Sequence, residues 1–392
     1  MLSCIINLMK TDIPIKTIIF YFQRIIYYFA LALSKLYYPA QKKPFVIIGL
    51  ETANLLKLYA KIFNAFSINL NHNSSYSNKY NLDFSKFSRV IQLLVLPFLF
   101  PFFIKKFDSF WYLSLGAFFV SADGRLWEYS VLKKNNIKIA SFFMGSDIRS
   151  YVLAREAARN INFDHHSFYL DQNISNHMIA INDLKSKKYS HATDLHADYI
   201  FNLAVDNISY IKKDVYMPPL PVERNLFNFN QAKWSNQDNI KILHCPSYPV
   251  LKGTQLVNAA IKKLKIEGYK FDFTLLTGVP HADVLEALDR SHIVLNEFYC
   301  FSPGIFGIEA LEANCLLFTS ASQEIEPGLF DGSDQAWVPT YYWQVYDNLK
   351  FYLDNFHLAQ AKANIGTTWA KTYCSHESTK SYVESIMNIK KI

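Results

Sequence analysis

The chain has 392 residues, of which 51% are hydrophobic and 16% aromatic, which is enough apolar material for the cores of two domains. The formal charge of +7 suits anionic partners, but there is neither a long basic stripe nor zinc-type cysteine spacing, so nucleic acid is not the expected partner. Five scattered cysteines without a CxxC pair exclude a disulfide scaffold and indicate a reducing compartment, the cytoplasm.

The N-terminal segment, residues 1–43, is apolar, aromatic and basic. Residues 17–38 form a long apolar run interrupted by Gln23, Arg24 and Lys35. It lacks the small-residue cleavage site of a signal peptide. We expect a helix that lies on a membrane surface; packing against the first domain and a true membrane span are the alternatives.

The first strand–helix unit follows directly. Residues 45–48 predict a buried strand, residues 49–53 a turn, and residues 54–66 a helix with apolar residues at helical spacing. Gly49, Glu51 and Thr52 lie in the turn, where a Rossmann-like domain begins. The turn lacks the glycine pattern of a dinucleotide fingerprint, so an ordinary strand–helix turn is the competing interpretation.

Residues 69–81 predict a loop, and residues 90–107 a second apolar stretch that contains Pro97 and Pro101 and ends at Lys105 and Lys106. It is too short and too broken to span a bilayer. An apolar hairpin rimmed with lysine would suit docking onto a bilayer or holding a lipid-linked acceptor, and a buried core helix is the alternative.

Two buried parallel strands are predicted at residues 109–121 and 137–144, with a helix at 125–135 between them. The second strand ends in a turn at 145–149 that contains Gly145, Ser146 and Asp147. Residues 151–190 are polar and predict irregular structure. His165 and His166 are adjacent and therefore point away from each other on a helix, so we expect no metal role for them.

A short strand at residues 197–201 and a proline cluster at 217–222 end the first half. The predicted domains are therefore an N-terminal segment (1–43), an N-terminal Rossmann-like domain (44–222), a C-terminal Rossmann-like domain (223–340) and C-terminal helices (341–392).

The most informative stretch runs from residue 241 to residue 327. An apolar strand leads through a loop with Ser247 to Lys252, Gly253 and Thr254, which open a helix at 255–267. A strand at 271–276 precedes the loop of Gly278, Val279 and Pro280. A strand at 293–295, a loop at 301–306 and a helix at 307–313 carrying Glu309 complete the pattern. A loop and helix start of this kind present N–H groups and a lysine to an anion.

This order of strands, Lys-Gly-Thr helix and Gly304-Ile305-Phe306-Gly307-Ile308-Glu309 segment resembles the retaining glycosyltransferases of the family-four-like type, which build bacterial surface polysaccharides. The resemblance implies an α/β protein with two Rossmann-like domains (GT-B), a cleft between them and C-terminal helices crossing back. It implies a hexosyltransferase that uses a nucleotide-diphosphate sugar and a glycan or lipid-linked acceptor, without a metal or other cofactor.

The resemblance also implies roles for individual residues. The residues that it assigns to donor binding are Ser247, Lys252, Gly253, Thr254, Gly278, Val279, Pro280, Gly304, Ile305, Phe306 and Glu309. It assigns Gly49, Glu51 and Thr52 to the acceptor side. It assigns a catalytic role to the cleft turn of Gly145, Ser146 and Asp147. Lys252 would neutralise the diphosphate, and Glu309 would accept hydrogen bonds from the ribose. The implied location is the cytoplasm, at the inner face of the membrane through residues 17–38 and 90–107.

Two positions depart from the family pattern. Met144 stands where relatives place a histidine, and Phe301 where many place a carboxylate; Glu297 could replace the latter only if the loop follows another route. A basic residue expected a few positions before the lysine is replaced by Ser247-Tyr248. These departures motivate an alternative: a catalytically degenerate GT-B protein that binds a nucleotide and serves as a partner or scaffold. A GT-B epimerase or phosphorylase is a further alternative.

Overall fold

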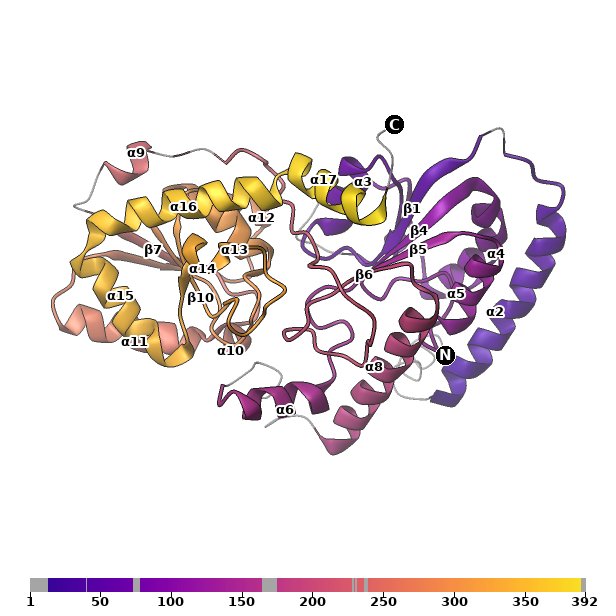
Figure 1. Ribbon diagram of the computed structural model, residues 1–392, viewed down its shortest axis with the longest axis horizontal. Helices are drawn as coiled ribbons and strands as arrows, with labels where there is room; N and C mark the ends of the chain where they lie inside the picture. The colour runs from indigo at the N-terminus through magenta and orange to yellow at the C-terminus, as the bar shows by residue number, and fades with distance from the viewer. Residues whose placement is uncertain are drawn as a thin grey trace.

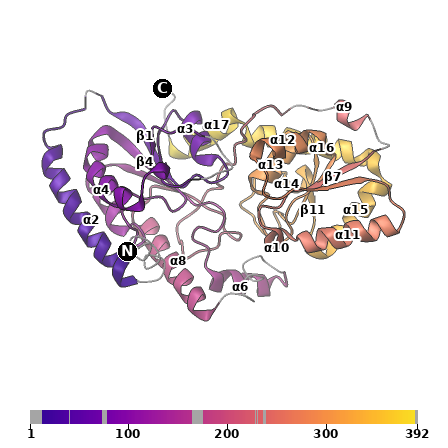
Figure 2. The same ribbon diagram turned by 180° about the vertical axis from the view of Figure 1, so that it is seen from behind.

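The computed structural model describes residues 13–39, 41–72, 78–163, 175–227, 229, 231–235 and 239–388. The chain folds into two α/β domains, each with a parallel sheet between helices (Figure 1). The N-terminal half forms one domain and the segment from residue 231 onward forms the other, while the last helix returns to the first domain (Figure 2). The predicted fold class, two Rossmann-like domains with C-terminal helices crossing back, is confirmed.

The N-terminal sheet has six parallel strands in the order β3-β2-β1-β4-β5-β6. Its central strands are apolar because helices cover both faces of the sheet. The strands are β1 (Lys43–Gly49), β2 (Phe66–Asn69), β3 (Leu82–Asp83), β4 (Phe107–Leu113), β5 (Lys138–Phe142) and β6 (Tyr199–Phe201). The predicted helix at 54–66 is too long: α3 (Leu55–Ile62) ends earlier, and Phe66 starts β2.

Helices cover the two faces of this sheet unequally. The face toward α2 (Ile13–Ser34) also carries α4 (Arg89–Lys106), α5 (Leu126–Lys134) and α8 (Asn176–His196). The short η1 (Phe84–Lys86) precedes α4. The opposite face carries α3 and, from the far end of the chain, α17 (His376–Met387).

The apolar stretch at 90–107 is one helix, α4, and not a hairpin. Pro97 and Pro101 lie inside the helix, where each removes a backbone hydrogen bond. Phe100, Phe103 and Ile104 are buried against the sheet, and this packing offsets the loss. The buried-helix alternative is therefore the correct one.

The prediction of irregular structure for residues 151–190 is wrong. Two helices, α6 (Tyr151–Asn160) and α8, occupy much of this range. The buried face of α8 includes the polar residues Asp183, Ser186, Ser190 and Thr193, so the usual apolar periodicity is missing from the sequence. His165 and His166 lie outside the described residues.

The C-terminal sheet has five parallel strands in the order β11-β10-β9-β7-β8. These are β7 (Lys241–His244), β8 (Asp272–Leu275), β9 (Ile293–Leu295), β10 (Leu316–Thr319) and β11 (Val338–Pro339). Around them lie α9 (Gln231–Trp234), α10 (Pro249–Lys252), α11 (Thr254–Ile266), α12 (His281–Arg290), α13 (Gly304–Glu312), α14 (Ser333–Ala336), η3 (Tyr342–Gln344), α15 (Val345–Asp354) and α16 (Phe356–Cys374). Helix α13 begins at Gly304, so residues 304–306 belong to its first turn and not to a loop.

Helix α17 ties the end of the chain to the N-terminal domain. Val383 and Met387 are buried in one cluster with Tyr59 of α3. The Tyr199 hydroxyl donates to the Met387 carbonyl oxygen over 3.0 Å. This return also contacts the linker segment before β7: the His376 N–H donates to Asn225 Oδ1 over 3.0 Å, and His376 Nε2 lies 2.9 Å from the Val222 carbonyl oxygen (Figure 1).

Candidate active site

Two adjoining cavities lie where the carboxyl ends of the strands in the two sheets face each other. The larger, of about 430 Å³, is lined mainly by the C-terminal domain, and we call it the α12–α13 cavity. The smaller, of about 290 Å³, is lined by both domains, and we call it the interdomain cavity. They share the wall residues Ala53, Ser247, Lys252, Gly304 and Ile305. Ligands of open α/β sheets bind at this edge.

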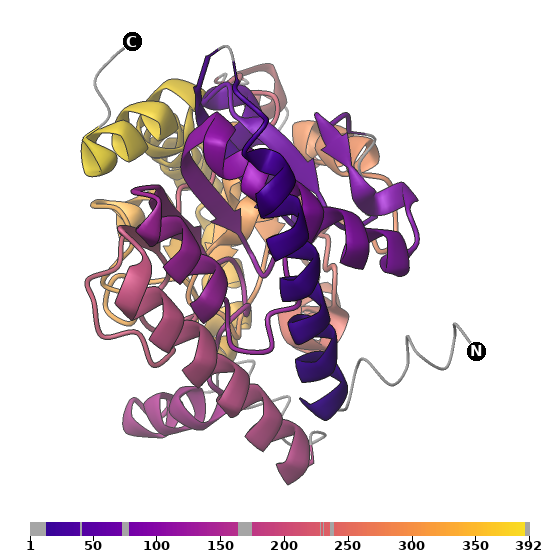
Figure 3. The same ribbon diagram turned by 90° about the vertical axis from the view of Figure 1, so that its right-hand side faces the viewer.

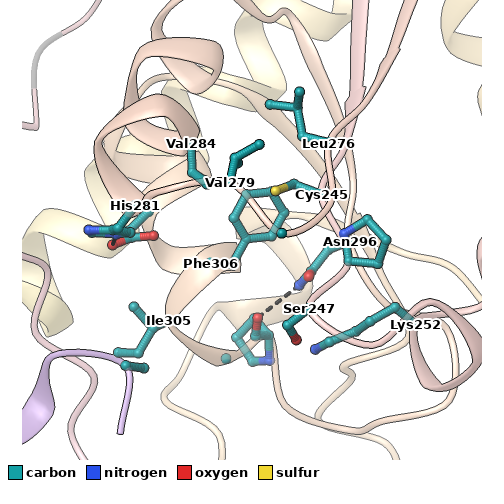
Figure 4. Close-up of a pocket in the computed structure, with 16 residues that line it drawn as sticks. Cys245, Ser247, Lys252, Leu276, Val279, His281, Val284, Asn296, Ile305 and Phe306 are labelled. Atoms are coloured by element: carbon teal, nitrogen blue, oxygen red, sulfur yellow. Dashed lines mark hydrogen bonds and ion pairs between the residues drawn. The ribbon is translucent and has the colours of Figure 1, made fainter. Parts of the chain in front are cut away.

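The α12–α13 cavity brings together most of the predicted donor-binding residues. Figure 4 shows Lys252 and His281 on opposite sides of it, with Phe306 between them. Its lining residues from the prediction are Ser247, Lys252, Gly278, Val279, Gly304, Ile305, Phe306 and Glu309. Apolar side chains cover part of the wall, with Val284 near His281 and Leu276 on the side toward Cys245 (Figure 4). The volume is in the range of cavities that hold small-molecule ligands.

Lys252 is the last residue of α10, and Gly253 follows it in a left-handed conformation that ends this short helix. The Lys252 ammonium donates to the Glu297 carboxylate, whose side chain is buried. Burial lowers the pKa of Lys252, but the charge of Glu297 outweighs it and holds the pKa above its usual value. Lys252 therefore presents a full positive charge where the two cavities meet.

The N-terminus of α13 adds a second source of positive potential. Gly304 begins the helix with φ +60°, and Ile305 and Phe306 follow in its first turn along the cavity wall. N–H groups in a first turn have no partner inside the helix and can donate to an anion; the Gly304 N–H donates to Ser302 Oγ over 3.3 Å in this structure. Asn296 supports this turn through a 2.8 Å hydrogen bond from Nδ2 to the Pro303 carbonyl oxygen (Figure 4).

Glu309 lies one turn further along α13, on the far side of the cavity from Lys252. Its Oε1 is 2.7 Å from Nε2 of His281, the first residue of α12. Burial lowers the pKa of His281, but Glu309 raises it by more, so the pKa lies above its usual value. Nδ1 of His281 is 3.8 Å from Glu223, which also pairs with Lys57 of α3 over 2.7 Å. A chain of charges thus links the cavity to the N-terminal domain.

The interdomain cavity contains the cleft turn after β5. Gly145 and Ser146 line it, as do Thr52, Met144 and Arg149. Asp147 lies inside the turn, where its Oδ2 accepts a 2.8 Å hydrogen bond from the Met144 N–H. Burial raises the pKa of Asp147 to about 6. Asp147 therefore shapes the turn, while Gly145 and Ser146 face the cavity.

The remaining predicted residues lie behind the cavity walls. Gly49 packs against Gly116, where an added Cβ on Gly116 would meet the Gly49 Cα at 2.5 Å. Glu51 is buried and accepts a 2.5 Å hydrogen bond from the Tyr80 hydroxyl. Thr254 is held by His244 Nε2 at 2.9 Å. Gly253 packs beside Phe298, and Pro280 precedes α12.

The two departures from the family pattern have different outcomes. Met144 lies in the interdomain cavity wall, so a thioether faces this space at the position where the family pattern predicted a histidine. Phe301 packs against Phe163 of the N-terminal domain, with ring centroids 5.0 Å apart, and its N–H donates to Asp206. The loop after β9 thus uses Phe301 for contact between the domains and turns Glu297 toward the interdomain cavity.

No protein-family model matches the sequence, and a search of curated proteins found no match. Solved structures do match. Sucrose-phosphate synthase from Thermosynechococcus elongatus has a TM-score of 0.55 at 10% identity, over 88% of this chain and 98% of that chain. The chain has the GT-B fold. Anabaena HepE in complex with UDP-glucose has a TM-score of 0.54 at 8% identity, over 88% and 100% of the two chains. An alpha-glucosyltransferase in complex with UDP and a 13-mer DNA has a TM-score of 0.52 at 9% identity, over 88% and 99%.

Two residues of this GT-B cleft, His281 and Glu223, were missed from the sequence, and Arg149 belongs to the predicted cleft turn at 145–149 but was given no role. His281 directly follows the predicted Gly278–Pro280 loop, so its position after a strand end could have identified it. Arg149 is buried and has Nη2 3.4 Å from Asp206. Glu223 comes from the segment between the domains, and no sequence signal indicated it. Among the residues that the structure describes, no group of three His, Cys, Asp or Glu side chains could hold a metal ion; metal independence stays a prediction.

Proposed function

We propose that this protein is a glycosyltransferase that moves a hexose-type sugar from a nucleotide-diphosphate donor to a glycan or lipid-linked acceptor of surface polysaccharide biosynthesis. The single observation that carries the proposal is the placement of Lys252 on one side of a cavity in a GT-B cleft and of His281, which pairs with Glu309 over 2.7 Å, on the opposite side. The two GT-B structures named above that hold a uridine nucleotide make UDP the first donor base to test.

The proposed donor lies along the α12–α13 cavity. Its diphosphate contacts Lys252, Ser247 and the first turn of α13. Its ribose hydroxyls donate to Glu309, and its base lies against the apolar wall near Val279. Charge develops on the diphosphate as the sugar leaves, so a cation and a helix N-terminus fixed in advance stabilise the transition state. These groups supply the compensation that a metal gives in other transferases, so the proposed reaction is metal-independent.

The transferred sugar would then lie at the junction of the two cavities, beside Lys252, Glu297 and Gly304. The acceptor hydroxyl would enter from the interdomain cavity, past Met144 and Ser146. The bond from the sugar to the β-phosphate oxygen breaks, a bond to the acceptor oxygen forms, and the acceptor proton passes to the departing phosphate. Because Met144 cannot accept a proton, a route through the phosphate on the same face of the sugar fits a retaining outcome.

The proposed location is the cytoplasm, where nucleotide sugars are made and where four free cysteines, Cys245, Cys300, Cys315 and Cys374, would stay reduced. Met144 favours a second candidate function, a nucleotide-binding GT-B partner without turnover, because this wall of the interdomain cavity lacks the polar group that the family pattern predicted.

One experiment separates the two candidates. The purified chain is incubated with UDP-, GDP- and ADP-sugars, and inside-out membrane vesicles, which expose the cytoplasmic face, serve as the source of acceptor. The release of nucleotide and the incorporation of sugar are measured in the same reaction. Turnover with one donor, lost in Lys252→Ala and retained in Lys262→Ala on the exposed face of α11, supports the transferase. Nucleotide binding without turnover on any pair supports the partner function.

A further inference from the structure

The outward face of α2 is apolar from Ile18 to Leu33. Large side chains recur at helical spacing, and Ile18, Ile25 and Phe29 are each about two-thirds exposed, at 68%, 67% and 64%. The other large exposed side chains of this face and of the turn after it are Tyr21, Phe22, Tyr28, Leu33, Leu36 and Tyr38. Soluble proteins place polar residues on the outward face of a surface helix. A contiguous apolar face of this kind marks a binding surface.

The inward face of α2 is fixed to the protein. Phe20, Tyr27 and Ala30 are buried. The side chain of Gln23 makes two hydrogen bonds, from Nε2 to the Leu93 carbonyl oxygen (2.9 Å) and from the Val120 N–H to Oε1 (2.7 Å). By length and composition alone, the helical segment of residues 15–34 could cross a membrane. If α2 crossed a membrane, it would lose these contacts with the N-terminal domain. Only the outward face of α2 can therefore contact the apolar part of a bilayer.

The charges around this face are mainly positive. Residues 13–43 and 84–107 together contain nine Lys and Arg and no Asp or Glu, against a net charge of +7 for the whole chain. Lys105 lies at the C-terminal end of α2, where it donates to the Tyr37 carbonyl oxygen over 3.1 Å. Lys16 lies near the other end, in the wall of a small cavity of about 90 Å³ that also contains Lys185 and Lys188. Asp108 pairs with Lys42 at the rim.

The exposed apolar face and the positive charges around it favour an anionic bilayer as the partner over a second copy of this chain. A second copy of this chain, packed face to face, would bring like charges together. An anionic bilayer offers both an apolar layer for the helix face and negative headgroups for the flanking lysines. Tyr21, Tyr28 and Tyr38 suit the boundary between the two phases. Figure 3 views α2 in front of the N-terminal domain, and Figure 1 places it at the end of the molecule remote from the C-terminal domain.

We infer that the outward face of α2 is a docking surface for an anionic lipid bilayer, on which the helix lies in the plane of the interface without crossing it. The C-terminal domain then extends away from the bilayer, so the α12–α13 cavity stays open to water. The inference is independent of the proposed function, because it concerns a surface of the other domain and its test needs no nucleotide.

The test is flotation of the full chain with vesicles of phosphatidylcholine alone and of an equal mixture with phosphatidylglycerol. The protein should float with the anionic vesicles and detach at high salt. The triple variant Ile18→Ser, Ile25→Ser and Phe29→Ser should bind about tenfold less, because membrane affinity scales with buried apolar groups. Lys16→Gln with Lys35→Gln should weaken binding about fivefold for each charge removed.

A matched variant controls for general loss of exposed apolar surface. It carries three changes on α8, α11 and α16, namely Leu195→Ser, Ile266→Ser and Ile365→Ser. This variant should float as the wild type does. Equal flotation of both triple variants, or none of the wild type, would overturn the inference. So would wild-type binding that survives alkaline extraction, which indicates a span, or a wild-type dimer that the α2 variant alone dissociates.

Discussion

The ammonium group of Lys252 donates to the carboxylate of Glu297 at the junction of the α12–α13 cavity and the interdomain cavity. The pair is mostly buried, with side-chain exposures of 24% and 4%. Each charge therefore depends on the other for its stability in the fold, and a bound diphosphate would compete with Glu297 for the same lysine.

Breaking this pair should destabilise the protein. Lys252→Ala leaves Glu297 buried without its partner, and we expect a loss of about 3 kcal/mol in the free energy of unfolding. Adding Glu297→Gln to the same chain removes the buried charge and should recover most of this loss. Urea denaturation of the two single variants and the double variant measures the coupling. A Lys252→Ala protein as stable as the wild type would show that the pair contributes nothing.

Glu297→Gln alone should separate nucleotide binding from transfer. The variant removes a competitor for Lys252, so the affinity for UDP should rise, by about fivefold. Transfer should fall about a hundredfold if the carboxylate contacts the sugar in place of the missing group at Phe301. Calorimetric titration gives the first number and a turnover assay gives the second. Unchanged turnover would remove Glu297 from the sugar-binding site.

Glu309→Gln should weaken nucleotide binding in a different way. A charge-assisted hydrogen bond to a ribose hydroxyl is lost, so UDP should bind about tenfold more weakly. We expect inorganic diphosphate to contact only the Lys252 end of the cavity, so its binding should not change. Glu286→Gln on the exposed side of α12 is the control. If diphosphate binding falls as much as UDP binding, the variant has disturbed the whole cavity and the ribose role is wrong.

The His281–Glu309 pair predicts a pH dependence of stability. The unfolded pKa of histidine is about 6.5, and Glu309 raises the folded pKa of His281 above it. The stabilisation is therefore fully present below pH about 6.5 and is lost as the pH rises through the folded pKa. The difference in unfolding free energy between the wild type and His281→Gln should be largest near pH about 6 and should shrink toward alkaline pH. A difference that grows with pH would contradict the assignment.

Three strands of the second domain, β7, β8 and β9, could be predicted because each ends at a distinctive turn, whereas β10 and β11 were not predicted. Lys252, Ser247 and Glu309 could be placed in one cleft because the carboxyl ends of parallel strands meet at one edge. The prediction of secondary structure was wrong where a segment lacks the usual apolar pattern of its element. Helix α8 has a partly polar buried face and was taken for irregular chain, and α4 tolerates two internal prolines because its neighbours bury it.

The predicted site was incomplete for a related reason. Glu223 enters the network of His281 only through the relative placement of the two domains, which no local pattern encodes. The role of Phe301 also depends on a distant residue, Phe163, which it meets across the interface. Which residues meet at the contact between the domains depends on how the two domains pack together. The sequence of one strand and its turn therefore cannot predict them.

The most direct test of the central claim is the thermal stability of the purified protein with UDP, GDP and ADP, alone and as sugar conjugates. A nucleotide that binds the native state raises the melting temperature by mass action. We predict that one nucleotide diphosphate, with UDP tested first, raises it in the wild type and in Lys262→Ala. The same nucleotide should have no effect on Lys252→Ala or on Lys252→Ala with Glu297→Gln. Stabilisation that is equal in all four proteins, or absent from the wild type with every nucleotide, would contradict a donor site at Lys252.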